Sequence, residues 1–564
     1  MVTMIYRGMT ALMVAIAFSG CALFDFGAYT NEPLTTGSAT APEGGPLQAG
    51  FKLRKVRSSA ACDAAGTPLA SPKKEPSVLV LLALSGGGSR AAFFSALVME
   101  ELQHQTVPFG SGVESDLLHE IDAISSVSGG SLAGAYYAIS HDPGQACAAP
   151  SRREWNPGRV DALMRRNYLR RWVGNWFWPV NVVRYWLTDF DRTDIMAQTL
   201  ADNLFDKRGT GVDVSLGELN PLRPNLIINA TAGSYSDGGQ VHFGDVFSFT
   251  DEDFRRICSS VDTYSVARAV MASATFPGAF NFMTLRDFGA RCTLPDEARD
   301  DGRRRYLHVF DGGNSDNLGL SSVRRVIWEA LQEDANGDLH LPYRNVVVIQ
   351  VDAFIHSPGA DPFKSDARNL VDFVVDLNFI DATDSLLEAN RDRLLEQFRR
   401  GELFPFGAPS AAASENDCVV FFRGEEIPQC ALRPADTWHR LNEEIGSKLT
   451  FVHLRFDKVP DVVAGCGENP ACLRSQLNRI GTSFKFQTDP NPQTGLVDAQ
   501  AIACAVPALF GRSADEPAND AHAQLPCGAL VLAPNPDAAR CWSHVRGVLQ
   551  GVPQETGASV DVCR

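Results

Sequence analysis

The stretch AISSVSGGSLAG, residues 123–134, passes from an apolar run into a helix-forming run through a cluster of serines and glycines. A buried strand that turns at once into a helix lifts the residue at the turn out of the sheet edge, and Ser128 occupies that position. Gly129 and Gly130 let backbone and substrate approach closely. The motif reads S-x-S-x-G, because Ser126 stands where nucleophile elbows usually have glycine. Taken alone, the stretch fits either a serine nucleophile or a serine-rich turn in a sheet protein.

Strand-like and helix-like segments alternate around this stretch. Residues 77–84, SVLVLLAL, form an unbroken apolar run that is typical of a strand buried on both faces. The following RAAFFSALVMEEL has apolar residues at helical spacing. Further strands are expected at 121–127, 224–231, 304–313 and 345–353. Further helices are expected at 129–140, within 264–280 with a stop near Pro277, and at 323–333 and 496–511. This alternation predicts an α/β fold, a three-layer sandwich whose mostly parallel central sheet is covered by helices on both faces.

A glycine loop lies between the first of these strands and its helix. Gly86, Gly87 and Gly88 allow several N–H groups to face one concavity, which is the backbone arrangement that holds an anion. The loop matches neither G-x-x-x-x-G-K-[ST] nor G-x-G-x-x-G, so the pattern favours an oxyanion hole over a nucleotide phosphate site. Arg90 is expected either to brace this loop or to meet a lipid phosphate.

A third stretch, FDGGNSDNLGL, starts at residue 310. Asp311 ends an expected strand, and a carboxylate at the sheet edge of Ser128 can accept the serine proton directly. Asp316 and Asn317 are expected to cap the next helix or to brace the turn.

A Ser-His-Asp triad is the alternative to a Ser–Asp dyad. In hydrolase order it requires a histidine after Asp311, for which His340 and His356 are the first candidates, and neither has a distinctive context. The dyad is the simpler interpretation.

The order S-G-G-G-x-R, S-x-S-G-G-S, D-G-G resembles that of the patatin-like phospholipases, serine lipid acyl hydrolases with a Ser–Asp dyad. ASATFPGAF (272–280) and IGTSFKF (480–486) are similar to further stretches of the family, so the resemblance covers roughly residues 77–512. It implies Ser128 as nucleophile and Asp311 as base, with Gly86, Gly87 and Gly88 as the oxyanion hole and no metal or cofactor. The implied activity is release of fatty acids from membrane lipids, of phospholipase A or lysophospholipase type. The alternative is a non-catalytic lipoprotein that binds or transfers lipid in the same pocket.

The N-terminus resembles a bacterial lipoprotein signal. Arg7 precedes the apolar run MTALMVAIAF, which is too short to span a bilayer comfortably. Ser19-Gly20-Cys21 is similar to a lipobox, so residues 1–20 are expected to be removed and Cys21 lipidated; an ordinary signal peptide is the alternative. No Asp follows Cys21, and we expect an exported, membrane-anchored lipoprotein in the outer membrane or periplasm of a Gram-negative bacterium. Residues 21–75, rich in Gly, Pro, Ser and Thr, predict a flexible tether.

Composition supports export and excludes one class of partner. A formal charge of -16 lacks the basic face that nucleic-acid binding requires. With Cys21 set aside, twelve of the 13 cysteines remain, and an oxidising compartment could pair them. The near pairs are Cys258 and Cys292, Cys418 and Cys430, Cys466 and Cys472, Cys504 and Cys527, and Cys541 and Cys563. Scattered buried thiols are the alternative, and no pair of C-x-x-C motifs indicates zinc.

Two insertions are expected within a catalytic domain at 76–512, near 141–222 and 401–479, and a cysteine-containing tail at 513–564. The first insertion carries Trp172, Trp176 and Trp178 interleaved with arginines. Such a patch suits a membrane interface, although a buried aromatic cap or the wall of an acyl-chain groove fits the same pattern.

Overall fold

The computed structural model describes most of the folded chain. The described residues are 31–34, 48–53, 57–62, 68–71, 77–109, 113–143, 153–207, 211–233, 235–237, 240–242, 244–276, 280–288, 305–335, 337–354, 390–404, 435–459, 472–478, 480–481, 485–492, 494–512, 535–551 and 563. The predicted signal peptide, Cys21 and His356 lie outside them. Among the described residues, no helix is both long and apolar enough to cross a membrane.

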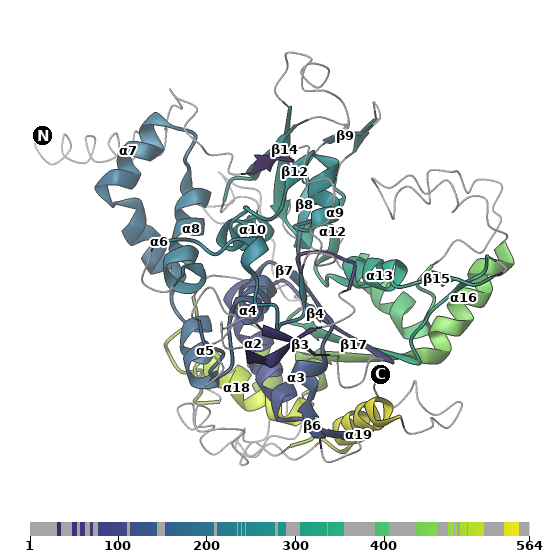
Figure 1. The fold of residues 1–564 in the computed structure, drawn as a ribbon. Coiled ribbons are helices and arrows are strands. Elements are labelled where there is room, and N and C mark those ends of the chain that lie inside the picture. The colour runs from purple at the N-terminus through teal and green to yellow at the C-terminus, as the bar shows by residue number, and fades with distance from the viewer. Residues whose placement is uncertain are drawn as a thin grey trace, which may run out of the picture.

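An eight-stranded sheet forms the centre of the molecule (Figure 1). Its order is β13 (Met283–Asp287), β14 (Arg305–Asp311), β8 (Asn225–Ala232), β7 (Ala123–Val127), β4 (Val78–Leu84), β17 (Asn345–Asp352) and β18 (Leu449–Arg455), and β11 (Val246–Ser248) pairs with β8. The five strands from β8 to β18 are parallel, whereas β11, β13 and β14 pair antiparallel with their neighbours. The expected mostly parallel sheet is confirmed.

Helices cover both faces of this sheet, and β4 shows how its residues divide between them. Val80 and Leu82 point into the larger core, which is built with α2 (Gly88–His104), α4 (Gly129–Ile139), α10 (Val266–Ser273) and α18 (Asp498–Leu509). Leu79 and Leu81 point into the smaller core, formed with α13 (Leu320–Glu329) and α16 (Ala435–Lys448). A strand buried on both faces explains why its sequence is apolar throughout. The predicted three-layer α/β sandwich is therefore confirmed.

The insertion near 141–222 is helical, and Figure 1 shows its helices at one side of the molecule. It contains α5 (Pro157–Met164), α6 (Tyr168–Trp176), α7 (Pro179–Leu187), α8 (Arg192–Leu200), the π-helix η1 (Ala201–Phe205) and the short helix η2 (Leu216–Glu218). The remaining elements are β1 (Glu32–Pro33), β2 (Arg57–Cys62), β3 (Pro68–Ser71), β5 (Thr106–Phe109), β6 (Val113–Asp116), α3 (Leu117–Glu120), β9 (Tyr235–Asp237), β10 (Gln240–His242), α9 (Asp251–Arg256), β12 (Ser259–Ser260), α12 (Gly313–Asp316), β15 (Gln332–Glu333), β16 (Leu339–His340), η4 (Phe456–Lys458) and α17 (Cys472–Leu477).

The expected insertion at 401–479 is not wholly peripheral. It contains β18, which pairs in parallel with β17 from Leu449 to Arg455, and α16, which packs in the smaller core. The strand LTFVHLR was not predicted, because it lies next to a polar helix and carries a histidine, yet six of its seven residues are buried. The central sheet therefore continues into this stretch.

Part of the expected tether is also ordered. Phe51 is fully buried in the smaller core, and the Asn31 amide donates to the Ser259 hydroxyl at 3.0 Å. Gln48 Nε2 donates to the carbonyl of Asn220 at 2.8 Å. Phe51 gives residues 48–53 an apolar contact with the smaller core, which composition alone did not reveal.

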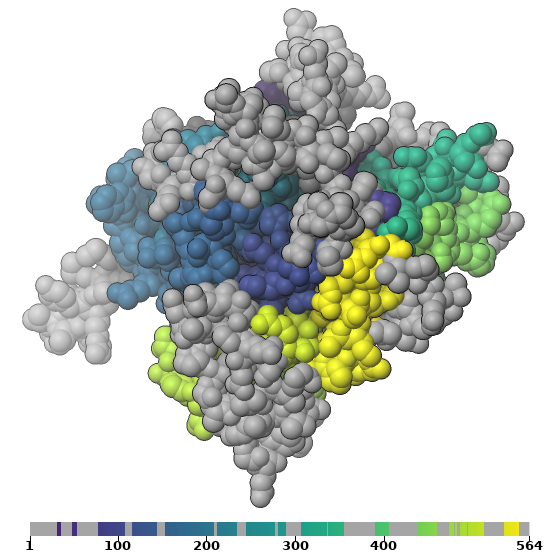
Figure 2. Space-filling model, turned by 60° about the horizontal axis from the view of Figure 1, so that its bottom comes forward, coloured from purple at the N-terminus to yellow at the C-terminus, as the bar shows by residue number. Residues whose placement is uncertain are grey.

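The C-terminal tail contains a helix that the sequence analysis did not expect, α19 (Pro536–Gln550). Figure 2 shows it, in yellow, beside α18. Trp542 stacks on Phe510 with ring centroids 4.5 Å apart, and its indole N–H donates to the carbonyl of Leu509. Cys541 and Cys563, one of the near pairs in the sequence, form a disulfide. Cys258 and Cys504 are also disulfide-bonded.

Candidate active site

Ser128 lies at the sharp turn between β7 and α4. Its backbone angles are φ 48° and ψ -118°, a conformation that a residue with a side chain rarely adopts and that surrounding structure must enforce. A Cβ at Gly129 would overlap the carbonyl oxygen of Gly88, and a Cβ at Gly130 would lie 2.7 Å from the carbonyl oxygen of Ser85. These two close approaches press the turn against the glycine loop, and both positions therefore require glycine.

Ser126 fits the place of the usual glycine without disturbing the turn. It is fully buried, and its hydroxyl donates to the carbonyl of Ile227 at 3.2 Å. Helix α4 passes close above it, since a Cβ at Gly134 would lie 3.5 Å from the Ser126 Cβ. The position requires a small side chain, and serine satisfies its own hydrogen bond there.

The Ser128 hydroxyl and the Asp311 carboxylate are in direct contact. Ser128 Oγ donates to Asp311 Oδ2 at 2.9 Å, across 183 positions of sequence. The other carboxylate oxygen, Oδ1, accepts from the Gly313 N–H at 2.8 Å, which fixes the carboxylate plane. Both side chains are buried, with 7% of Ser128 and 6% of Asp311 exposed. The pair is thus shielded from bulk water but still reachable at the sheet edge.

Strand β14 brings Asp311 to this point from the opposite direction. It runs antiparallel to β8, and Asp311 pairs with Ala230 near the end of β8 that lies beside Val127 and the elbow. The helix expected to stop near Pro277 ends a few residues earlier, at Ser273, because its next residues bind β14 instead. The Asp311 N–H donates to the Thr275 carbonyl and the Gly312 N–H to the Ser273 carbonyl.

Burial raises the pKa of the Asp311 carboxyl to about 6, against the lowering effect of the hydrogen bonds from Gly313 and Ser128. At neutral pH the group is therefore ionised, yet a stronger base than an ordinary aspartate. Both properties suit a carboxylate that has to accept a hydroxyl proton.

Ser273 holds the elbow from the side of α10 and was not singled out by sequence. Its hydroxyl accepts from the Ser128 N–H at 2.7 Å and donates to the Asn229 carbonyl at 2.5 Å. The only available signal was its place inside the ASATFPGAF stretch. The hydroxyl satisfies a buried amide that a strained turn leaves without a helix or sheet partner.

Ser273→Ala is expected to lower kcat about tenfold with little change in KM, because the unpaired Ser128 N–H costs about 1–3 kcal/mol and loosens the turn. Steady-state kinetics on a soluble ester measure the split. Ser140→Ala is a matched control, since Ser140 is equally buried and donates to the Tyr137 carbonyl at the far end of α4. Equal kcat values for the two variants would leave Ser273 a purely structural role.

The glycine loop begins α2 and has two residues at positive φ, Gly87 at 139° and Gly88 at 60°. The Gly86 N–H donates to the Asn317 carbonyl at 3.0 Å, so the expectation that it faces an oxyanion is corrected: its one hydrogen is already used. Within the described chain, no acceptor is found for the amides of Gly87 and Gly88. These two N–H groups, at the positive end of a 17-residue helix, are the donors open to a developing negative charge.

Asn317 lies between the glycine loop and the Asp311 turn. A Cβ at Gly86 would overlap its side-chain oxygen, and a Cβ at Gly313 would lie 2.9 Å from the same atom. Together with its carbonyl bond to Gly86, this contact shows that Asn317 braces the two motifs against each other.

Arg90 braces the loop and does not point to a substrate. It is 3% exposed, its Nε donates to the Ala353 carbonyl at 2.8 Å, and its Nη1 donates to the Ile480 carbonyl. Burial lowers the pKa of its guanidinium to about 10, which still leaves it charged. Of the two roles expected for Arg90, the structure favours bracing.

No histidine within the described ranges is hydrogen-bonded to Ser128 or Asp311. His308 bonds Thr284 Oγ1 at 3.0 Å, and His453 Nε2 bonds Asp352 Oδ2 at 2.8 Å. His340 pairs with Gln332 across a short hairpin. In the part of the chain that is described, no group of acidic, histidine or cysteine side chains could hold a metal ion.

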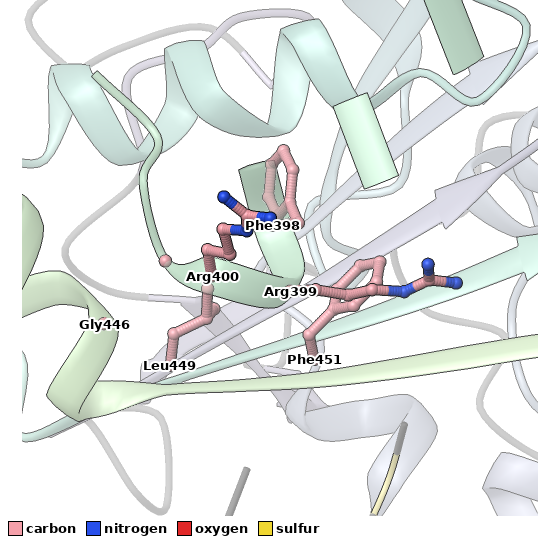
Figure 3. A pocket seen from close by; sticks show the side chains of 7 residues that line it. Phe398, Arg399, Arg400, Gly446, Leu449 and Phe451 are labelled. Carbon is pink, nitrogen blue, oxygen red and sulfur yellow. The ribbon is translucent and has the colours of Figure 1, made fainter. Parts of the chain in front are cut away.

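One pocket lies away from the dyad (Figure 3). Its volume is about 70 Å³, and Phe398, Arg399, Arg400, Gly401, Gly446, Leu449 and Phe451 line it. Leu449 begins β18, so this pocket faces the amino-terminal edge of the parallel strands, opposite to Ser128. It is too small for a lipid acyl chain, and we do not assign substrate to it.

Comparison with known proteins agrees with this geometry. Residues 82–324 match the family model described as patatin-like phospholipase, a family of lipid acyl hydrolases. Among solved structures, VipD from Legionella pneumophila is similar at 13% identity over 74% of this chain and 73% of that chain, with a TM-score of 0.19, which is too low to support an argument. No curated protein matches.

Proposed function

We propose, from the premise that residues 82–324 form a patatin-like phospholipase domain, that the protein releases fatty acids from membrane lipids through a Ser128–Asp311 dyad. The observation that carries this proposal is the 2.9 Å bond from Ser128 Oγ to Asp311 Oδ2 at a strained turn. A hydroxyl at such a turn, in contact with a buried carboxylate, has the base that a serine nucleophile needs.

In this mechanism Ser128 Oγ attacks the ester carbonyl carbon while its proton passes to Asp311. The tetrahedral oxyanion accepts hydrogen bonds from the amides of Gly87 and Gly88. The proton on Asp311 then goes to the departing alcohol, which leaves an acyl-serine. Asp311 next takes a proton from water, the hydroxide attacks the acyl group, and Ser128 recovers its hydrogen as the fatty acid leaves.

The test is mass analysis of products from phospholipid vesicles, combined with a fluorophosphonate probe. The wild-type chain should release free fatty acid and lysophospholipid, and the probe should label Ser128. Lipid that binds without release, with Ser128 unlabelled, would refute this mechanism and support the non-catalytic lipid-binding alternative.

Activity is expected to fall as pH drops through about 6, since the dyad needs ionised Asp311 and its pKa is raised to about 6. The pH profile of kcat/KM on a soluble ester measures this, and it should be flat from about pH 7 to 8. His308→Gln is the matched control, because His308 is the titratable residue three positions before Asp311. An inflection that disappears in this variant would assign it to the histidine instead.

The export route belongs to the same proposal. Cleavage after residue 20 and lipidation of Cys21 would tie the catalytic domain to the membrane that holds its substrate. Within the expected tether, Asn31 and Gln48 already bond to the folded domain. An outer-membrane or periplasmic location in a Gram-negative bacterium follows from the lipobox resemblance, and metabolic labelling with a fatty acid, abolished by Cys21→Ser, tests it.

A further inference from the structure

The hairpin of α6 and α7 is the most basic and most apolar surface segment of the described chain. Residues 162–188 contain five arginines and no Asp or Glu, in a chain whose formal charge is -16. Nine large apolar side chains are strongly exposed among the described residues, and six of them belong to this hairpin. These six are Val173, Phe177, Trp178, Val180, Val183 and Leu187. Exposure concentrated in this way marks an interaction surface.

The exposed residues are not all the ones that sequence favoured. Trp172 packs inward, where its indole N–H donates to the Arg192 carbonyl at 2.8 Å and its ring lies 5.5 Å from that of Phe280. Trp176 packs beside it, with ring centroids 5.0 Å apart. Trp178 alone of the three is strongly exposed, at 62%, and its neighbour Phe177 is 73% exposed. We define the tip surface as Phe177, Trp178, Val180 and Val183.

The hairpin is held firmly, so this surface is presented rather than collapsed. Asn181 Nδ2 donates to the Asn175 carbonyl across the turn, and Asn175 Nδ2 donates to Thr199 Oγ1 on α8, both at 2.9 Å. Arg184 lies over the ring of Phe190 at 4.0 Å, which fixes the far end of α7.

The hairpin is also connected to the dyad through α10. Asp194 of α8 forms an ion pair with Arg268 of α10, and Ser273 at the end of α10 binds the Ser128 amide. Two further exposed apolar residues lie next to residues that bind β14: Phe276, 44% exposed, follows Thr275, and Phe282, 43% exposed, precedes β13. A partner on the tip surface would therefore lie against the same helical layer that supports the nucleophile (Figure 1).

We propose that the tip surface docks onto an anionic lipid bilayer, an inference that rests on the proposed lipid-hydrolase function. Charge complementarity selects this occupant: Arg170, Arg171 and Arg184 are exposed beside the tip. Neither Arg170 nor Arg171 has a carboxylate partner in the described part of the chain. Aromatic rings at headgroup depth with guanidinium groups at the phosphates are the arrangement that bilayer interfaces favour. A second copy of this chain docked tip to tip would place its own hairpin arginines against these arginines, and like charges disfavour that pairing.

The test uses the mature chain, residues 21–564, with Cys21→Ser, so that neither the apolar run of the signal nor a lipid anchor contributes, and with Ser128→Ala, so that vesicles stay intact. Sedimentation with vesicles of phosphatidylglycerol and phosphatidylcholine in equal parts should pellet this protein, and salt should weaken the binding. Phe177→Ala/Trp178→Ala should weaken binding about tenfold or more, because both exposed rings leave the interface. Arg170→Glu/Arg171→Glu should do the same.

Arg400→Glu/Arg440→Glu is the matched control, with the same charge change at two exposed arginines (60% and 64% side-chain exposure), one of which lies on α16. It should bind vesicles like the parent. The proposal is overturned if both hairpin variants bind vesicles as the parent does, or if the parent binds pure phosphatidylcholine vesicles equally well. It is also overturned if the hairpin variants lose self-association but still bind vesicles. With Ser128 restored, the hairpin variants should hydrolyse a soluble ester normally. A wild-type chain that does not hydrolyse this ester would contradict the proposed function, independently of whether the hairpin binds vesicles.

Discussion

Replacing Ser128 by alanine is expected to lower kcat for ester hydrolysis by about 10⁴-fold or more, because Ser128 Oγ carries the acyl intermediate in the proposed mechanism. The fold should persist. Asp311 keeps its hydrogen bond from Gly313, and the Ser128 amide keeps its bond to Ser273. Free fatty acid release, measured with thermal unfolding of the same preparation, gives both readings.

Ser126→Ala separates the nucleophile from its neighbour. Ser126 lies two positions earlier, is also buried, and its hydroxyl donates to the Ile227 carbonyl. This variant should keep activity within about tenfold of wild type, since it removes one neutral hydrogen bond. If Ser126→Ala were inactive and Ser128→Ala active, the assignment of the nucleophile would be wrong.

Gly129→Ala is expected to destabilise the protein by about 3 kcal/mol or more and to abolish activity. The new Cβ would overlap the Gly88 carbonyl oxygen, and a backbone atom at a crowded turn cannot move aside as a flexible side chain can. The same displacement would move the Gly88 amide, which is one of the two proposed oxyanion donors. Chemical denaturation should therefore show a lower free energy of unfolding for this variant, and the same preparation should not hydrolyse the ester.

The control is Gly174→Ala in α6, where a Cβ would meet nothing within 4 Å. Alanine is the better helix former, so this variant should be unchanged or more stable by up to about 1 kcal/mol. A Gly129→Ala protein as stable as the Gly174→Ala protein would show that the elbow and the glycine loop are not pressed together.

Much of the fold followed from local pattern. The apolar run at 77–84 required a strand buried on both faces, and the structure contains it as β4. The glycines after it allowed the tight entry into α2, and the S-x-S-x-G stretch predicted the turn that leads into α4. These features depend on neighbours within a few residues, which is why periodicity and turn chemistry were enough.

Other elements were invisible because their signal lies in distant partners. Strand β18 is buried because it pairs with β17 and packs against α16, and its own residues do not indicate that burial. Helix α19 is anchored by the stacking of Trp542 on Phe510, and Phe51 finds its core within a polar stretch. No window of sequence contains these contacts.

In the candidate site, too, some features follow from local sequence and others from contacts between distant segments. The sequence determined the chemical groups and their strand ends: a serine at an elbow, three glycines and an aspartate followed by two glycines. Tertiary structure decided that β14 arrives antiparallel, that Ser273 holds the elbow amide, that Gly86 is already bonded and that Arg90 braces the loop. The physical reason is that residue type limits which bonds a group can form, whereas packing between remote segments settles which bond each group does form.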